Sequence, residues 1–251
     1  MSGATKGNAN KNLSDRVREH LIEHIRVNQL KSGEVIPSEV QVSSDLGISR
    51  GIVREAFRAL NMAGIVEVSN GRSPRVGRIN DEGIGQVLQH ALATRQTTIE
   101  QVLDLRAAIE IRAAELAAVH RTDEEAQAVL KEVAAMRAAR QSQNRFIESD
   151  TRFHGLLAAA TGNPLFAVIG GALRGSLRAS IRAGLKNRTN LGQVDQIIAT
   201  HESIADAIAQ RDAVRAGRYM TIHFEEAFRS FNLQPVNPSN IREERLSRMA
   251  R

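Results

Sequence analysis

The chain has 251 residues, of which 42% are hydrophobic and only 3% aromatic, and it contains no cysteine. This length suits two modest domains better than one, and the lack of cysteine excludes disulfides and thiolate metal sites. No stretch approaches the roughly 18 consecutive apolar residues of a membrane span. The net charge is +6, of which residues 1–80 carry +4 (12 Lys or Arg against 8 Asp or Glu), while residues 81–231 are balanced. This uneven charge favours an anionic partner for the first third, nucleic acid above all.

The first elements in chain order are a polar tail, three helices and a hairpin. Residues 1–12 lack the apolar core of a signal peptide, and we expect a disordered tail there. Apolar residues at a helical period predict a helix at 13–30, and serine caps precede two further helices at 38–46 and 49–63. Alternating apolar residues on both sides of the Asn-Gly pair in 65–79 then predict a β-hairpin.

Two helices joined by a short turn and followed by a hairpin form a winged helix-turn-helix, which we assign to residues 13–79. Its second helix is the expected recognition helix, because two arginines lie four residues apart near its N-terminus. The wing carries a basic residue directly after its tight turn, where it can reach the DNA backbone or a minor groove. The alternative is that these arginines only solubilise a small helical domain. The expected DNA contacts are Ser49, Arg50, Arg54, Asn70, Gly71 and Arg72.

From residue 80 onward the pattern is entirely helical, so the predicted fold class is mainly α. We expect residues 80–97 to form a linker and the first sensor helix, with glycines near its start as possible hinge points. Residues 98–231 would complete an antiparallel bundle of six or seven helices, and residues 232–251 would form a C-terminal tail. The predicted helices are 81–94, 97–119, 123–142, 145–161, 164–186, 193–210 and 212–231.

Four residues with metal-binding side chains occur at helical spacing in this second part. Asp150 and His154 are four residues apart and project from one helix face, while His201 and His223 occupy or adjoin the apolar stripes of two later helices. An isolated Asp/His pair is ordinary surface decoration, and a single buried histidine is more often a hydrogen-bonded core residue. The full set of three nitrogens and one oxygen on inward faces instead indicates a divalent metal site, with Zn²⁺ first and Ni²⁺, Mn²⁺ or Fe²⁺ as alternatives.

The first part of the chain resembles the DNA-binding domain of GntR-type bacterial transcription regulators. The resemblance rests on the run IPSEVQVSSDLGISRGIVREAFRALNMAGIVEVSNGRSPRVG. Two positions depart from the usual pattern of that family. Val40 stands where a basic residue commonly touches DNA, and Gly51 stands where a small hydroxyl residue is frequent. The absence of the basic residue at position 40 is expected to change operator preference or to weaken one DNA contact.

The second part resembles the FCD effector domain of the FadR/VanR branch of these regulators. The matching stretches are LRAAIE, DTRFHGLLAAATGNPLF and HESIADAIAQRDAVRAGRYMTIHF. Metal-binding members of that branch have one Asp and three His at these positions, and this chain has all four. The resemblance also implies that Arg106 meets an acidic effector. The alternative is a surface arginine paired with Glu110 four residues later.

Together these features predict a cytoplasmic bacterial transcription regulator, associated with the nucleoid when it is bound to DNA. We expect a homodimer on an inverted-repeat operator in double-stranded DNA, because one recognition helix reads only a few base pairs. A small carboxylate bound at the metal would release the repressor. The alternatives are a regulator that senses the metal ion itself and, from a different class, a metal-dependent enzyme that activates water at the cluster.

Overall fold

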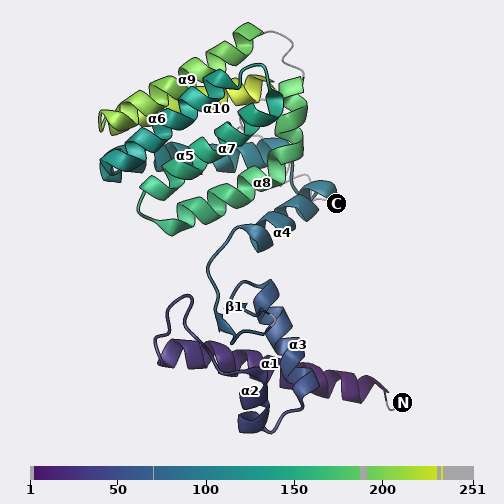
Figure 1. Cartoon of the computed structure of the whole chain (residues 1–251). Helices are drawn as coiled ribbons and strands as arrows, with labels where there is room; N and C mark the ends of the chain where they lie inside the picture. The colour runs from purple at the N-terminus through teal and green to yellow at the C-terminus, as the bar shows by residue number, and fades with distance from the viewer. Residues whose placement is uncertain (1–2, 70, 187–190, 231–232, 234–251) are drawn as a thin grey trace. The chain divides into compact units, whose positions relative to one another are not determined.

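The computed structural model describes residues 3–69, 71–186, 191–230 and 233, with residues 3–12, 178–186 and 191 described by their backbone alone. The described residues form ten helices and one two-stranded sheet (Figure 1). The chain divides into two compact units, Met1–Gly83 and Ile84–Arg251. No helix in the described ranges is long and apolar enough to cross a membrane.

The first unit has the predicted order of three helices and a hairpin. Its elements are α1 (Gly3–Val27), α2 (Glu39–Leu46), α3 (Arg50–Met62), β1 (Val66–Glu67) and β2 (Arg75–Val76). Apolar side chains from all three helices and from β1 pack into one core. The largest contributions come from Val17, Leu21, Ile36, Val42, Ile48, Val53, Phe57, Leu60 and Val66. Burial of this stripe fixes α3 with its opposite, arginine-bearing face toward solvent.

The N-terminal tail is the first expectation that the structure corrects. Helix α1 begins at Gly3, so residues 3–12 are helical rather than disordered. The sequence argument started the helix at the first apolar position, Leu13, because polar residues give no amphipathic signal. The polar residues nevertheless extend a helix that the apolar residues after them anchor to the core.

Local capping explains most of the helix-turn-helix boundaries. The Ser38 side chain accepts a hydrogen bond from the backbone N–H of Gln41 at 3.2 Å. Gly47, at φ 63°, ends α2 in the left-handed conformation that glycine tolerates. Ser49 occupies the N-cap position of α3 but makes no side-chain capping bond, contrary to the expected cap. Its hydroxyl is therefore not engaged by the helix that it precedes.

The wing is a short hairpin whose strands pair Val66 with Val76 and Glu67 with Arg75. In its turn, the N–H of Arg72 donates to the carbonyl of Ser69 at 3.2 Å. Directly after β2, the backbone of Gly77 lies very close to that of Gly64, just past the end of α3. Only glycine fits at position 77, because a Cβ there would overlap the Gly64 carbonyl.

The second unit consists of seven helices within the described residues. They are α4 (Glu82–Ala93), α5 (Ile99–His120), α6 (Asp123–Ala138), α7 (Gln143–Ala160), α8 (Pro164–Lys186), α9 (Leu191–Ala209) and α10 (Ala213–Ser230). Full capping boxes begin α5, from Thr98 and Gln101, and α6, from Thr122 and Glu125. These bounds agree with the predicted helices to within a few residues.

Helix α5 is the centre of this bundle, because it packs against α7, α8, α9 and α10. Figure 1 shows α5, α6, α7, α9 and α10 side by side in the helical unit. Small residues on α5, such as Ala114 and Ala117, are fully buried and allow the neighbouring helices to approach closely. At one edge α4 packs on α8, where a Cβ on Gly85 would lie 3.8 Å from Ala172. Gly85 is therefore a packing position inside α4, and the hinge at the start of this helix stays a prediction.

The close backbone approach in the wing generates a stability prediction. A Cβ added at Gly77 would lie 2.1 Å from the carbonyl oxygen of Gly64, so Gly77→Ala forces the backbone apart. We expect a loss of about 1–3 kcal/mol, the usual cost of overpacking. Gly51→Ala is the matched control, since no atom lies within 4 Å of the added Cβ on that helix. Urea denaturation of both variants checks this, and equal midpoints for the two would contradict it.

Candidate functional site

The structure brings the four predicted metal ligands together inside the bundle. Asp150 and His154 lie on α7, His201 on α9 and His223 on α10. One ring nitrogen from each histidine lies within 4.8 Å of the others. Asp150 Oδ1 lies 3.1 Å from His201 Nε2 and 3.7 Å from His154 Nε2. All three imidazoles are buried, so the Asp150/His154 pair is not surface decoration.

Helix α9 fixes the ring of His201 in one tautomer. Its Nδ1 lies 2.8 Å from the carbonyl oxygen of Ile197, one turn earlier. A carbonyl can only accept, so Nδ1 carries a hydrogen, and in the neutral ring the lone pair is on Nε2. His201 Nε2 lies 3.1 Å from Asp150 Oδ1 without the geometry of a hydrogen bond, and a cation between the two atoms would offset the repulsion of their lone pairs. This orientation suits a metal ligand, because Nε2 has no hydrogen-bond partner among the described residues.

The electrostatics of the cluster suit a bound cation. Burial by itself would raise the pKa of the Asp150 carboxyl. The effect of the neighbouring imidazoles of His201, His154 and His223 is larger, and it holds this pKa well below its usual range. Burial also lowers the pKa of His154 and of His223, so both rings favour the neutral, ligand form. Three imidazole nitrogens and one carboxylate oxygen fit the donor set of a divalent metal.

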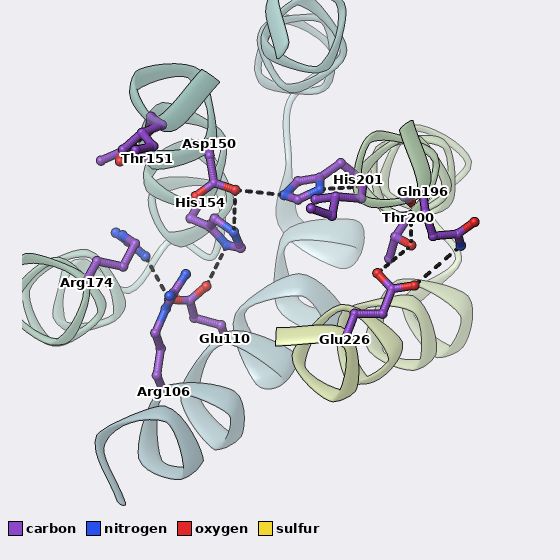
Figure 2. A network of polar contacts seen from close by, with 12 residues as sticks. Arg106, Glu110, Asp150, Thr151, His154, Arg174, Gln196, Thr200, His201 and Glu226 are labelled. Atoms are coloured by element: carbon purple, nitrogen blue, oxygen red, sulfur yellow. Dashed lines mark hydrogen bonds and ion pairs between the residues drawn. The ribbon is translucent and has the colours of Figure 1, made fainter. Parts of the chain in front are cut away.

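A second buried network lies beside the cluster and was not predicted as part of the site. Glu110 of α5 lies between two arginines and His154 (Figure 2). Its Oε1 accepts from Arg106 Nε at 2.7 Å and from Arg174 Nη1 at 3.0 Å, while Oε2 lies 2.6 Å from His154 Nδ1. Although burial opposes ionisation, Arg106 and His154, with a smaller effect of Arg174, hold the pKa of Glu110 well below its usual range.

Arg106 therefore pairs with Glu110, as one alternative proposed, but in the interior and not on the surface. The exposed fraction of Arg106 is only 4%. Its guanidinium carbon Cζ lies over the ring of Phe224, 5.3 Å from the ring centre. Within the described part of the chain its two Nη groups have no hydrogen-bond partner. The spacing to Glu110 was a usable signal in the sequence. Arg174, by contrast, had only the weak signal of a charge inside the apolar run of α8.

A further set of hydrogen bonds ties α9 to α10 next to the cluster. Glu226 accepts from Thr200 Oγ1 at 3.2 Å and from Gln196 Nε2 at 3.4 Å (Figure 2). Because Thr200 precedes His201 and Glu226 follows His223 by three residues, these bonds help to hold the two histidine-bearing helices in register.

A small pocket adjoins the metal-ligand cluster. It is lined by charged groups on one side and apolar residues on the other, namely Ile109, Glu110, Ala113, His154, Leu157, Ala158, Phe166, Arg174 and Met220. Arg106 does not line it. Arg174 is the cation that faces this space.

The predicted DNA-contacting residues form an exposed set in the first unit. Ser49, Arg50 and Arg54 are exposed at the start of α3, and Gly71 and Arg72 are exposed at the wing turn. Asn70 lies outside the described residues.

Arg54 has one partner in the free protein. Its Nε lies 3.4 Å from Glu39 Oε2, with more than half of the Arg54 side chain in solvent. An exposed pair of this kind is worth little, so the guanidinium can exchange it for a phosphate or a base.

Comparisons with known proteins agree with both units. Residues 13–76 match the gntR family of bacterial regulatory proteins, and residues 101–226 match the FCD domain. The HTH-type transcriptional repressor NanR of Salmonella schwarzengrund is 33% identical over 222 residues, which are 86% of this chain and 82% of that protein. The NanR repressor of Cronobacter sakazakii is 31% identical over 223 residues, with 88% and 85% of the two chains covered.

The chain belongs to the GntR family. The solved structure of Streptococcus agalactiae GntR shares its fold, with a TM-score of 0.64 and 24% identity over 86% of this chain and 99% of that one. The winged helix is thus the GntR DNA-binding domain, and the helical bundle with the histidine cluster is the FCD domain. The relatives are transcription regulators, and the predicted family and fold class are confirmed, whereas the enzyme alternative loses its support.

The buried histidines of this GntR-family protein predict how its metal-free stability depends on pH. His154 and His223 have pKa values lowered from 6.5 in the folded protein, so below that pH the unfolded chain binds more protons. Stability should therefore fall as the pH drops below about 6.5, by up to about 1.4 kcal/mol per pH unit for each histidine. Urea unfolding of chelator-treated protein between pH 7.5 and 5.5 measures this. A stability that stays constant over this range would contradict it.

Proposed function

We propose that this protein is a metabolite-responsive repressor, in which a small organic acid binds at a divalent metal in the FCD domain and weakens operator binding. The observation that supports it most is the buried cluster of Asp150, His154, His201 and His223 in the same chain as a GntR winged helix. The repressor sign is taken from the names of the NanR relatives. Such a protein would act in the bacterial cytoplasm, at its operator in the nucleoid.

The DNA-binding part of the proposal concerns α3 and the wing. The N-terminus of α3 is exposed, and Arg50 and Arg54 lie one turn apart on the face opposite its buried stripe. Ser49 and the backbone N–H groups of this terminus can contact a phosphate. One such helix reads too few base pairs for useful specificity, so we expect a homodimer on an inverted repeat.

The metal part of the proposal assigns one divalent cation to each chain. Asp150 Oδ1 and the Nε2 atoms of His154 and His201 would hold it, together with a ring nitrogen of His223. When bound, the cation would supply a Lewis-acid position for a carboxylate oxygen of the effector. Zn²⁺ is the first candidate, since nitrogen donors dominate the set.

The effector part of the proposal uses Arg106 as a second anchor. Its guanidinium is buried, already oriented by Glu110 through Nε, and has two Nη groups without partners in the described residues. An arginine so oriented suits a carboxylate, which accepts two parallel hydrogen bonds. The neighbouring pocket, with Arg174 and His154 on its wall, is too narrow for a water molecule in this structure, so an acid would enter only after its wall moves.

Helix α8 is the element that we propose to transmit ligand binding. It contains Arg174, which contacts Glu110 beside the metal cluster, and Ala172, which packs against Gly85 of α4. Helix α4 follows directly on the winged helix in the chain. An effector acts on DNA only through unequal affinity for two arrangements of the dimer, and a shift of α8 against α4 would provide them.

The first test addresses the DNA interface. Arg54→Ala removes a charged group that reaches a base or phosphate, so operator binding should weaken by about 1–3 kcal/mol for each bound helix. Arg112→Ala is the matched control, because it removes an equally exposed charge from the FCD domain. Titrations of a labelled operator at physiological salt compare them. If Arg54→Ala binds like the control, the assignment is wrong.

The second test addresses the effector and the metal together. Small carboxylates are screened by thermal shift with and without Zn²⁺, Ni²⁺ or Mn²⁺, and each hit is added to an operator titration. We expect a carboxylate to stabilise only the metal-loaded protein and to weaken operator binding about 5- to 150-fold, the range of a 1–3 kcal/mol coupling. The combined His201→Ala and His223→Ala variant should neither bind metal nor respond.

Three outcomes would decide against parts of this proposal. Elemental analysis that finds no metal, even after metal is added, refutes the metal site. An effector that binds the double variant as well as the wild type refutes the mode of effector binding. Operator affinity that changes with metal alone, and no further with any carboxylate, identifies the protein as a metal sensor instead.

A further inference from the structure

We infer that Glu110 is a positioning residue of the metal centre, whose carboxylate holds His154 in the tautomer that presents Nε2 to the cation. The inference rests on the proposed metal binding and goes beyond it, because Glu110 is not one of the four ligands. Glu110 comes from α5, whereas the ligands come from α7, α9 and α10. The central helix of the bundle would thereby contribute to the site without touching the metal.

The contact between Glu110 and His154 requires a hydrogen on the ring nitrogen. Oε2 lies 2.6 Å from Nδ1, and both side chains are buried. A carboxylate oxygen and a nitrogen lone pair at this separation would repel each other, so Nδ1 is the protonated nitrogen. The pair does not have the angle of a hydrogen bond in this structure, so the short distance alone indicates the position of the hydrogen.

With the hydrogen on Nδ1, the lone pair of the neutral ring is on Nε2. That atom lies 3.7 Å from Asp150 Oδ1, the same oxygen that His201 Nε2 faces at 3.1 Å. His201 reaches the same state by a different route, because its Nδ1 lies 2.8 Å from the Ile197 carbonyl. Each of the two rings thus has one acceptor beside its Nδ1, which is a backbone carbonyl for His201 and a carboxylate for His154. The Nε2 atoms of both rings then face Asp150 Oδ1.

Two arginines keep the Glu110 carboxylate in place for this contact. Arg106 Nε and Arg174 Nη1 both donate to Oε1, which leaves Oε2 for His154. Guanidinium groups remain charged at any relevant pH, so they offset the cost of burying the carboxylate. A carboxylate behind a ligand histidine is a known way of fixing ring orientation and raising ligand basicity.

The tautomer can be tested in the metal-free wild-type protein. Long-range ¹H–¹⁵N correlation spectra of the histidine rings, assigned by loss of one signal in His154→Gln, show which nitrogen is protonated. We expect the Nδ1–H form for His154. Finding the Nε2–H form overturns the inference without any change at Glu110, so the test does not depend on a variant that folds poorly.

The matched test is Zn²⁺ affinity, measured by competition with a chelator. In Glu110→Gln the amide oxygen should accept from the two arginines, which turns the NH₂ group toward His154 Nδ1 and favours the wrong tautomer. We expect Zn²⁺ binding to weaken by about 10- to 100-fold and the Nε2–H form of His154 to appear in the spectrum. Glu115→Gln on the same helix, whose carboxylate pairs with Arg112 at 2.7 Å, is the control and should bind like wild type.

The results separate this inference from the proposed function. If the wild type binds Zn²⁺ and Glu110→Gln binds it equally well, the inference is wrong and the metal site stands. If the wild type binds no divalent metal, the metal site itself is wrong. A weaker affinity without a change of tautomer would show that Glu110 acts only on stability, and this also overturns the inference.

Discussion

The interior of the FCD domain brings one carboxylate and three buried imidazoles into one cluster. Asp150 Oδ1 faces the Nε2 atoms of His201 and His154, and neither nitrogen has a hydrogen-bond partner in the described chain. Buried groups of this kind destabilise a protein unless something positive lies among them. The rest of the domain is arranged around this cluster, since α7, α9 and α10 each supply a side chain to it and α5 supplies Arg106 and Glu110 beside it.

Two groups of buried polar side chains lie next to each other in this domain, and they differ in how their charges are balanced. The inner layer of imidazoles and one carboxylate is the proposed cation site. The outer layer consists of Glu110 between Arg106 and Arg174, and it is satisfied by its own ion pairs. His154 belongs to both, because one ring nitrogen faces Asp150 and the other faces Glu110. Any ligand that competes for these arginines would therefore also act on the metal site, which gives the proposed effector a physical link to the cation.

Most helix boundaries in the structure agree with the local sequence signals that predict them. Capping boxes at Thr98 and Thr122 begin helices where the sequence predicted them, and Gly47 ends α2 as expected. These predictions succeed because caps and amphipathic stripes are local properties, decided within one or two turns. The tail at residues 3–12 is the exception, since polar residues give no stripe and their helix depends on the segment that follows.

The sequence by itself determined the order of the elements, the GntR-type winged helix and the four residues that meet inside the bundle. It did so because each of them is tied to a helix face or to a recognisable run of residues. Only the tertiary structure decided that Arg106 is buried, that Arg174 shares its partner, and that Glu110 stands behind His154. The physical reason is that these contacts join α5, α7 and α8 across long separations in the chain. Helical periodicity tells which face a residue occupies, but not which residue of another helix lies opposite it.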